Sequence, residues 1–264
     1  MPNDSDEQST SVNISSNVLF HFTKTFDIIV SILKNGLYVH YCPEYGVFEN
    51  DVDPEHPTPP PFALPMVCFC DLPLFLIKSH LQFYGPYGIG LKKSWGMEQG
   101  ISPVLYVHGK ALLLYRLSQL YESASNSKDG HSAIVSALLT VKAYEKPYEG
   151  RAWRDDNITR TIRFYNEREW RFVPPLRDED AFMLNTAEYE DNTTRESANA
   201  KLSKTYPLKF SAEDVLYIIV QTDSEVRPMI SALRNMKGIY TEVLISSENC
   251  TSFRAKLHTP LVRF

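Results

Sequence analysis

A short amphipathic stretch at residues 168–174 constrains the fold of this chain more than any other part of its sequence. Charged Glu169 and Arg171 alternate there with apolar Trp170 and Phe172, and two prolines follow. A period of two is typical of a half-buried strand, and proline ends such a strand because it cannot continue the hydrogen-bonded ladder. The stretch therefore predicts a strand with its two charged side chains on one face. That charged face is either a working site or a solvated surface.

The bulk composition describes an ordinary globular protein. The 264 residues are 43% hydrophobic and 22% charged, which suffices for a substantial core. The net charge of -5 argues against wholesale electrostatic binding of nucleic acid, although a local basic groove stays open. The apolar runs are far shorter than the ~20 residues of a membrane span, and the first residues lack the pattern of a secretory signal. We expect a soluble cytoplasmic protein without membrane contact.

The distribution of residue types predicts one α+β domain. Residues 1–16 are polar and read as a disordered tail, and residues 17–264 form the domain. Two insertions interrupt it, a proline-rich one at 43–65 and an acidic, polar one at 177–201. Short strands interleave with helices without a regular βα rhythm, which favours α+β architecture. Neither insertion separates halves with complete strand sets, so a single domain is expected.

Periodicity predicts the individual elements. Strands are expected at 18–23, 37–41, 66–70, 87–91, 103–108, 169–172, 215–220 and 241–245. Helices are expected at 26–35, 72–84, 110–122, 132–143 and 225–236. Gly88 and Gly90 predict that another backbone segment or a ligand lies close to the strand that carries them. Without a third glycine and a following helix they are not a dinucleotide-binding fingerprint.

The cysteines do not form a recognisable metal motif. No Cys-x-x-Cys pair exists, and the spacing from His21, His40 or His80 is not that of a zinc site. We therefore predict no metal and reduced, buried thiols. These cysteines are Cys42, Cys68, Cys70 and Cys250.

The opening of the chain resembles that of ADP-ribosyltransferase-like proteins. The resemblance rests on LFHFT at 19–23 followed by IL-x-x-G at 32–36. It implies a split, mixed or antiparallel sheet flanked by helices, and NAD as cofactor.

Three further motifs resemble the AbiGi family of abortive phage resistance proteins. They are VCFCDLPL at 67–74 with His80, YGPYGIGL at 84–91 and NEREWR at 166–171. Together the two resemblances cover roughly residues 18–245 in sparse motifs. AbiGi proteins are described as antitoxin partners in abortive infection, which implies a cognate toxin or antitoxin protein as partner.

The transferase resemblance implies a set of cofactor-binding residues. His21 on the first strand would bond the ribose of NAD, and Thr23 would contact the polar edge of the ligand. Tyr84 or Tyr87 would stack on the nicotinamide, and Arg171 would complete the set.

The same resemblance implies that Glu169 is catalytic and that Glu167 orients the substrate, as in transferases with a Glu-x-Glu pair. A carboxylate fixed on a rigid strand suits this chemistry because it stabilises the positive charge that develops as nicotinamide leaves. Glu169→Gln should then abolish turnover and leave the melting temperature nearly unchanged.

Each of these residues also has a structural interpretation. His21 could be a core histidine and Tyr84 a packed helix residue. Glu169 and Arg171 could form an exposed ion pair that contributes little. The arginines between 151 and 163 read mainly as a solvated loop, with a phosphate-bearing substrate as the alternative.

Two functions therefore stay open. The chain is either an NAD-dependent transferase that modifies a macromolecular ADP-ribose acceptor in phage defence, or a non-catalytic antitoxin that binds a cognate toxin. In the second case the insertions 43–65 and 177–201 are candidate contact surfaces. A zinc-dependent nuclease is a distant third. Convergence of His21 and Glu169 on one cleft is the geometric test of the enzyme hypothesis.

Overall fold

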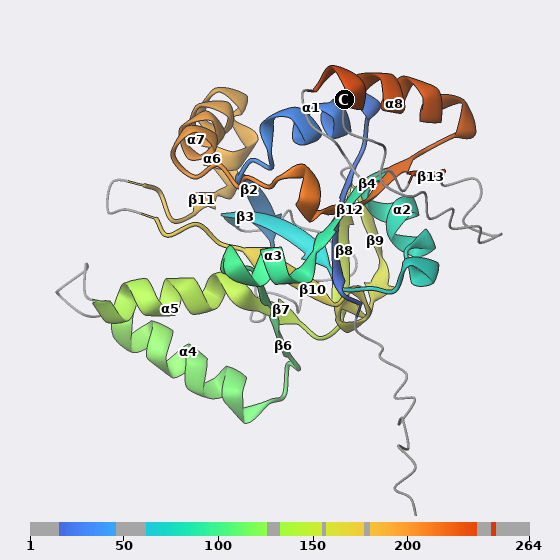
Figure 1. The fold of residues 1–264 in the computed structure, drawn as a ribbon. Coiled ribbons are helices and arrows are strands. Elements are labelled where there is room, and N and C mark those ends of the chain that lie inside the picture. The colour runs from blue at the N-terminus through green and yellow to red at the C-terminus, as the bar shows by residue number, and fades with distance from the viewer. Residues whose placement is uncertain are drawn as a thin grey trace, which may run out of the picture.

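A sheet of nine strands runs through the described part of the chain (Figure 1). The computed structural model describes residues 16–45, 62–125, 133–154, 157–176, 180–236 and 244–246. Seven strands lie in the order β13-β12-β4-β1-β3-β10-β5, and β2 and β11 pair with β3. All these pairs are antiparallel except β12 with β13. The strands are β1 (Val18–Thr23), β2 (His40–Glu44), β3 (Phe62–Cys70), β4 (Tyr87–Lys92), β5 (Ser102–Pro103), β10 (Glu169–Phe172), β11 (Leu184–Asn185), β12 (Val215–Val220) and β13 (Leu244–Ser246).

Helices cover both faces of the sheet. The larger core lies under α1 (Phe26–Asn35), α3 (Lys93–Glu98), α7 (Asn192–Thr205) and α8 (Val226–Asn235). Its strand residues come from β1, β2, β3, β4 and β12, and α7 packs beside β2. A smaller core on the other face lies under a 3-10 turn, η1 (Leu74–Leu76), and α2 (Lys78–Tyr84). In α1 the apolar side chains recur at helical spacing, Thr25 caps the first turn and Gly36, with φ of 86°, ends it.

A helical hairpin projects from this body (Figure 1). It consists of α4 (Leu112–Ser125) and α5 (Ala133–Tyr144). Two parallel strands, β6 (Leu105–Val107) and β7 (Glu145–Pro147), join the hairpin to the rest of the structure. A β-hairpin of β8 (Gly150–Arg154) and β9 (Asn157–Ile162) follows, and a 3-10 turn, η2 (Phe164–Glu167), leads into β10.

The structure confirms the α+β class and corrects several boundaries. The described residues form one mixed body of antiparallel sheet and helices. The strand expected at 37–41 lies at 40–44, because Leu37 makes only an isolated bridge to Leu208. The strand expected at 103–108 is two strands with different partners, β5 on β10 and β6 on β7. The helix expected at 72–84 is η1 followed by α2.

The proline-rich insertion is shorter than predicted. Residues 43–44 belong to β2, and residues 62–65 belong to β3. Pro65 lies opposite Tyr41 of β2. It is tolerated because, on the other edge of β3, it falls between the residues paired with β11 (62–63) and those paired with β10 (67–70). The remainder, 46–61, lies outside the described residues, as do residues 1–15 of the predicted tail.

Most of the insertion predicted at 177–201 is helical, and its described residues are mostly exposed or half-buried. Residues 186–190 form α6 (Thr186–Glu190), and α7 begins at Asn192. Asn185 and Glu188 make a capping box, Asp191 caps the next helix and buried Leu202 anchors it. Because the rest of α7 is polar, no apolar period revealed it. The division into one domain and a tail stays a prediction.

Candidate functional site

The sheet opens between β1 and β3. β1 pairs with β4 along its full length, but it pairs with β3 only at Phe20 and Cys70. Beyond that point the same edge of β3 pairs with β2, whereas β10 pairs with the opposite edge of β3. The diverging strands leave a cavity of about 1110 Å³, which is also lined by residues of α1, α2 and β7. The cavity therefore exists because one sheet splits into two arms.

His21 bridges the two arms. Its Nδ1 lies 2.8 Å from the carbonyl oxygen of Cys68 on β3, and its ring tilts against Phe69. Because a carbonyl only accepts, Nδ1 donates, and Nε2 of the neutral ring is an acceptor. Burial lowers the pKa of His21 more than the bond to Cys68 raises it. His21 is therefore a neutral imidazole at pH 7.

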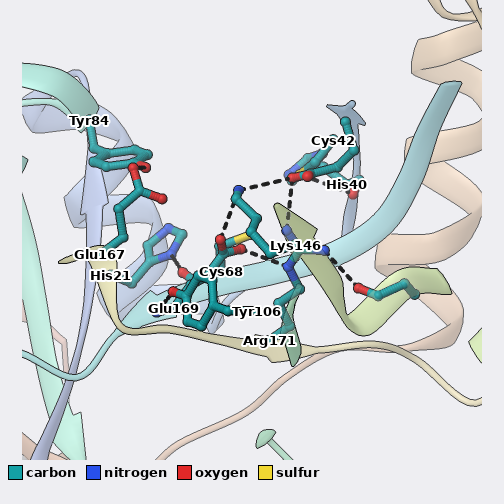
Figure 2. Close-up of polar contacts among 12 residues, drawn as sticks. His21, His40, Cys42, Cys68, Tyr84, Tyr106, Lys146, Glu167, Glu169 and Arg171 are labelled. Carbon is teal, nitrogen blue, oxygen red and sulfur yellow. Dashed lines mark hydrogen bonds and ion pairs between the residues drawn. The ribbon is translucent and has the colours of Figure 1, made fainter. Parts of the chain in front are cut away.

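Tyr84 and Glu167 both line the cavity and contact each other there (Figure 2). The Tyr84 hydroxyl donates to Oε1 of Glu167 at 2.5 Å, and the Tyr84 ring stacks on His80. Gly85 ends α2 with φ of 126°, and a Cβ atom there would lie 2.2 Å from the Thr23 carbonyl oxygen. Only glycine therefore allows the end of α2 to sit so close to β1.

Glu169 lies in a compact network of charges (Figure 2). Its Oε1 accepts from Nε of Arg171 at 2.7 Å, and its Oε2 pairs with Nζ of Lys146 at 2.9 Å. Glu44 closes the network, 3.0 Å from Nη2 of Arg171 and 3.6 Å from Nζ of Lys146. Arg171 also donates from Nη1 to the carbonyl oxygen of Ala143 in the last turn of α5. Two carboxylates thus balance two cations.

Burial makes this balance necessary. The Arg171 side chain has 0% exposure, and Glu169 and Lys146 are also buried. Burial raises the pKa of the Glu169 carboxyl, but Arg171 and Lys146 outweigh it and hold that pKa well below its usual range. Burial lowers the pKa of Lys146, and Glu169 and Glu44 reverse this, so that pKa lies well above normal. Glu169, Lys146 and Arg171 are therefore charged at neutral pH.

The buried network corrects one interpretation of the sequence. An exposed ion pair between Glu169 and Arg171 is wrong, because both side chains are buried. The alternation itself is confirmed, since Trp170 and Phe172 lie on the other face and pack, half-buried, against the larger core. On this strand the charged face is the more deeply buried of the two.

Five of the predicted site residues line the cavity: His21, Thr23, Tyr84, Glu167 and Glu169. The convergence of His21 and Glu169 that the enzyme hypothesis requires is therefore present.

Glu167 reaches the cavity from a 3-10 turn rather than from the strand. Arg168 has φ of 46° and breaks the alternation between Glu167 and Glu169. Both carboxylates face the cavity, but for a different reason than the predicted strand period.

Two predicted site residues lie elsewhere. Tyr87 packs in the larger core, and its hydroxyl donates to Oε1 of Glu225 at 2.6 Å. Arg171 lies behind Glu169 and does not line the cavity. Neither side chain therefore contacts a ligand bound in this cavity, and a cofactor-binding role for Tyr87 and Arg171 stays a prediction.

Sequence reasoning missed Glu44 and Lys146. Glu44 falls inside the predicted proline-rich insertion, and Lys146 follows a helix without any motif around it. Their role depends on strand pairing between distant segments, so no local signal could have revealed it. Of the predicted arginine cluster at 151–163, the structure describes the side chain of Arg163, which is exposed and lies near Glu149. The side chains of residues 151–160 are not among those that the structure describes.

The thiols around the cavity are reduced. Cys70 is buried, and Cys42 and Cys68 are half-buried. The neighbouring Cys42 thiol and burial raise the pKa of Cys68 well above its usual value. Within the described ranges no three His, Cys, Asp or Glu side chains are grouped to hold a metal ion, and Cys250 lies outside them.

Comparison with known proteins identifies the family. The sequence profile of the family described as "Putative abortive phage resistance protein AbiGi, antitoxin" matches residues 35–221. The chain belongs to the AbiGi family. An abortive phage resistance protein AbiGi from Lactococcus lactis subsp. cremoris is 28% identical over 200 residues, which cover 66% of this chain and 79% of that protein. No solved structure matches the chain.

The match confirms the AbiGi resemblance and spans Glu44, Lys146, Glu167, Glu169 and Arg171. The segment that resembles ADP-ribosyltransferases at 19–23 precedes the matched range. None of the helices in the described ranges is long and apolar enough to cross a membrane.

Proposed function

We propose that this AbiGi-family chain acts in abortive infection by binding NAD in the cavity between β1 and β3 and transferring ADP-ribose to a macromolecule. One observation carries the proposal. His21, Tyr84, Glu167 and Glu169 come from three distant segments, and all line one cavity. Its volume of about 1110 Å³ is sufficient for a dinucleotide. The split between β1 and β3 supports an ADP-ribosyltransferase-like fold.

The chemistry of the walls supports this proposal. Nε2 of His21 is an acceptor for a ribose hydroxyl. Glu169 stays ionised, and an ionised carboxylate stabilises the positive charge that develops at C1′ of the ribose as the bond to nicotinamide breaks. Both its oxygens already accept from Arg171 and Lys146, which fixes the carboxylate in position. Glu167, held by Tyr84, is the second carboxylate and orients the acceptor.

Two tyrosines offer a matched test. Both hydroxyls donate to a glutamate, Tyr84 to Glu167 in the cavity and Tyr87 to Glu225 in the core region. NAD is titrated into the purified protein by calorimetry, and release of nicotinamide is followed in parallel. Tyr84→Phe is expected to weaken binding or release by about tenfold, the effect of one lost hydrogen bond to a charged group. Tyr87→Phe should stay within about twofold of the parent protein.

His21→Ala is expected to lower the affinity for NAD, because it removes the hydrogen-bond acceptor Nε2 between β1 and β3. No binding of NAD by the parent protein, or equal effects of the two tyrosine variants, would contradict the proposal.

A non-catalytic antitoxin is the second candidate. It is favoured by the network around Glu169, in which both carboxylate oxygens are engaged by buried cations, as in a purely structural cluster. The description of the family as antitoxin agrees with it. In this case the chain neutralises a cognate toxin by binding it, and Glu167→Gln retains full neutralisation in a co-expression assay. The transferase proposal expects Glu167→Gln to be defective.

A further inference from the structure

Helix α4, which belongs to the projecting hairpin (Figure 1), carries exposed leucines. Leu112, Leu113 and Leu120 are 69%, 45% and 50% exposed. Single exposed leucines are common, but several exposed leucines on one projecting helix indicate an interaction site. These leucines lie apart from the cavity, so an inference from them is independent of the proposed NAD chemistry.

The spacing places these side chains on one side of the helix. Leu112, Arg116 and Leu120 follow each other at intervals of four residues, and Leu113 precedes Leu120 by seven. At about 100° and 1.5 Å per residue, the four side chains occupy a sector of roughly 100° and a length of ~12 Å. We call these four residues the leucine stripe.

The inner face of α4 is already occupied. Leu114 and Leu117 are buried, and the Tyr121 hydroxyl donates to the carbonyl oxygen of Leu138 on α5 and to Glu145. The leucine stripe is therefore a second apolar face, beyond the one that attaches α4 to the hairpin. A helix that needs only one buried face to fold does not require it.

The charge at the centre of the stripe identifies the kind of partner. Arg116 is exposed and lies midway in sequence between Leu112 and Leu120. Its guanidinium lies 5.6 Å from the centre of the Tyr115 ring, and its Nη1 donates to Gln119. The acidic residue of α4, Glu122, lies about 120° around the helix from Arg116 and outside the stripe. The stripe thus presents leucines on either side of one positive charge.

A second copy of the chain does not suit this surface. Arg116 lies at the midpoint of the stripe. If two copies of α4 pair through the stripe about a two-fold axis at this midpoint, whether parallel or antiparallel, the two Arg116 side chains face each other. Like charges opposed in a desolvated contact disfavour association. A partner protein with a carboxylate at that position would instead form an ion pair with Arg116.

We propose that the leucine stripe docks an amphipathic helix of a partner protein, whose apolar face is interrupted by a carboxylate opposite Arg116. The leucines supply the contact area and Arg116 sets the register and the choice of partner.

The test uses two labelled synthetic peptides and the full chain. Each peptide is an amphipathic helix of about fifteen residues with leucines every three or four positions, and the centre of its apolar face carries Glu in one peptide and Lys in the other. Fluorescence anisotropy is expected to show that the Glu peptide binds at least about tenfold tighter than the Lys peptide. Arg116→Glu should reverse this order.

Two further variants locate the binding. The double variant Leu112→Ser, Leu120→Ser is expected to weaken the Glu peptide by about tenfold or more. Met97→Ser is the matched control, because Met97 is 63% exposed on α3, outside the hairpin, and it should leave the affinity unchanged. Leu112, Leu120, Met97 and Arg116 are all exposed, so circular dichroism should show that every variant is folded.

Three results would overturn the proposal. One is that neither peptide binds, and another is that both bind equally to the parent protein and to Arg116→Glu. The third is a dimer of the chain in sedimentation velocity that the double leucine variant disperses, because the stripe would then dock a second copy.

Discussion

Replacing Glu169 with glutamine is expected to destabilise the fold strongly. The amide keeps the shape of the carboxylate but removes its charge, so Lys146 and Arg171 share the single carboxylate of Glu44. Arg171 has 0% exposure and Nε lies 2.7 Å from Glu169, so water cannot replace the lost partner. Removing one partner of a buried ion pair costs about 3–5 kcal/mol. For a chain of this size that corresponds to a melting temperature lower by about 10 °C.

This expectation replaces the one drawn from the transferase resemblance, which left the melting temperature of Glu169→Gln nearly unchanged. The assay is thermal unfolding by calorimetry together with urea unfolding at pH 7. Glu167→Gln is the control, because glutamine still accepts from the Tyr84 hydroxyl, and its cost should stay within about 1.5 kcal/mol.

A second substitution distinguishes charge imbalance from loss of shape. Adding Lys146→Met to Glu169→Gln leaves one carboxylate, Glu44, against one cation, Arg171. The double variant should therefore be more stable than Glu169→Gln alone, since an apolar side chain in place of a buried unpaired charge is often neutral or stabilising. Strictly additive losses, or a cost of Glu169→Gln below about 0.5 kcal/mol, would refute the reasoning.

Two further predictions concern the split between β1 and β3. Burial lowers the pKa of His21 in the folded chain below its ordinary value of 6.5. As the pH falls through 6.5, His21 therefore takes up a proton in the unfolded chain but not in the folded chain, which favours unfolding. The urea midpoint should therefore fall between pH 7.5 and 5.5, and less steeply in His21→Gln; an unchanged slope would exclude the effect. Gly85→Ala should cost more than about 3 kcal/mol, because a Cβ lies 2.2 Å from the Thr23 carbonyl oxygen. Gly100→Ala, also at positive φ but with no atom within 4 Å, should cost about 1 kcal/mol, and equal losses would contradict the steric argument.

Much of the fold follows from local patterns. The strands at 18–23 and 215–220 and the helix at 26–35 were predictable with their ends, because apolar period and capping residues are local. Helix α7 was not predictable, since its capping signals carry no apolar stripe.

The candidate site was predictable only in part. His21 and Glu169 were found because they lie in recognisable motifs on strands, whose alternation restricts where a side chain points. Tyr87 packs in the larger core outside the cavity, because strand pairing, rather than its neighbouring glycines, decides which face it joins.

By itself the sequence determined the alternation of the strand at 169–172, its end at two prolines and the pair of charges on one face. Only the tertiary structure decided that this face is buried, because β7 brings Lys146 and β2 brings Glu44 against it from distant parts of the chain. A strand pattern records which side chains share a face. Which face loses contact with water depends on the segments that pack there, and for Glu169 and Arg171 those segments also supply the opposite charges that make burial possible.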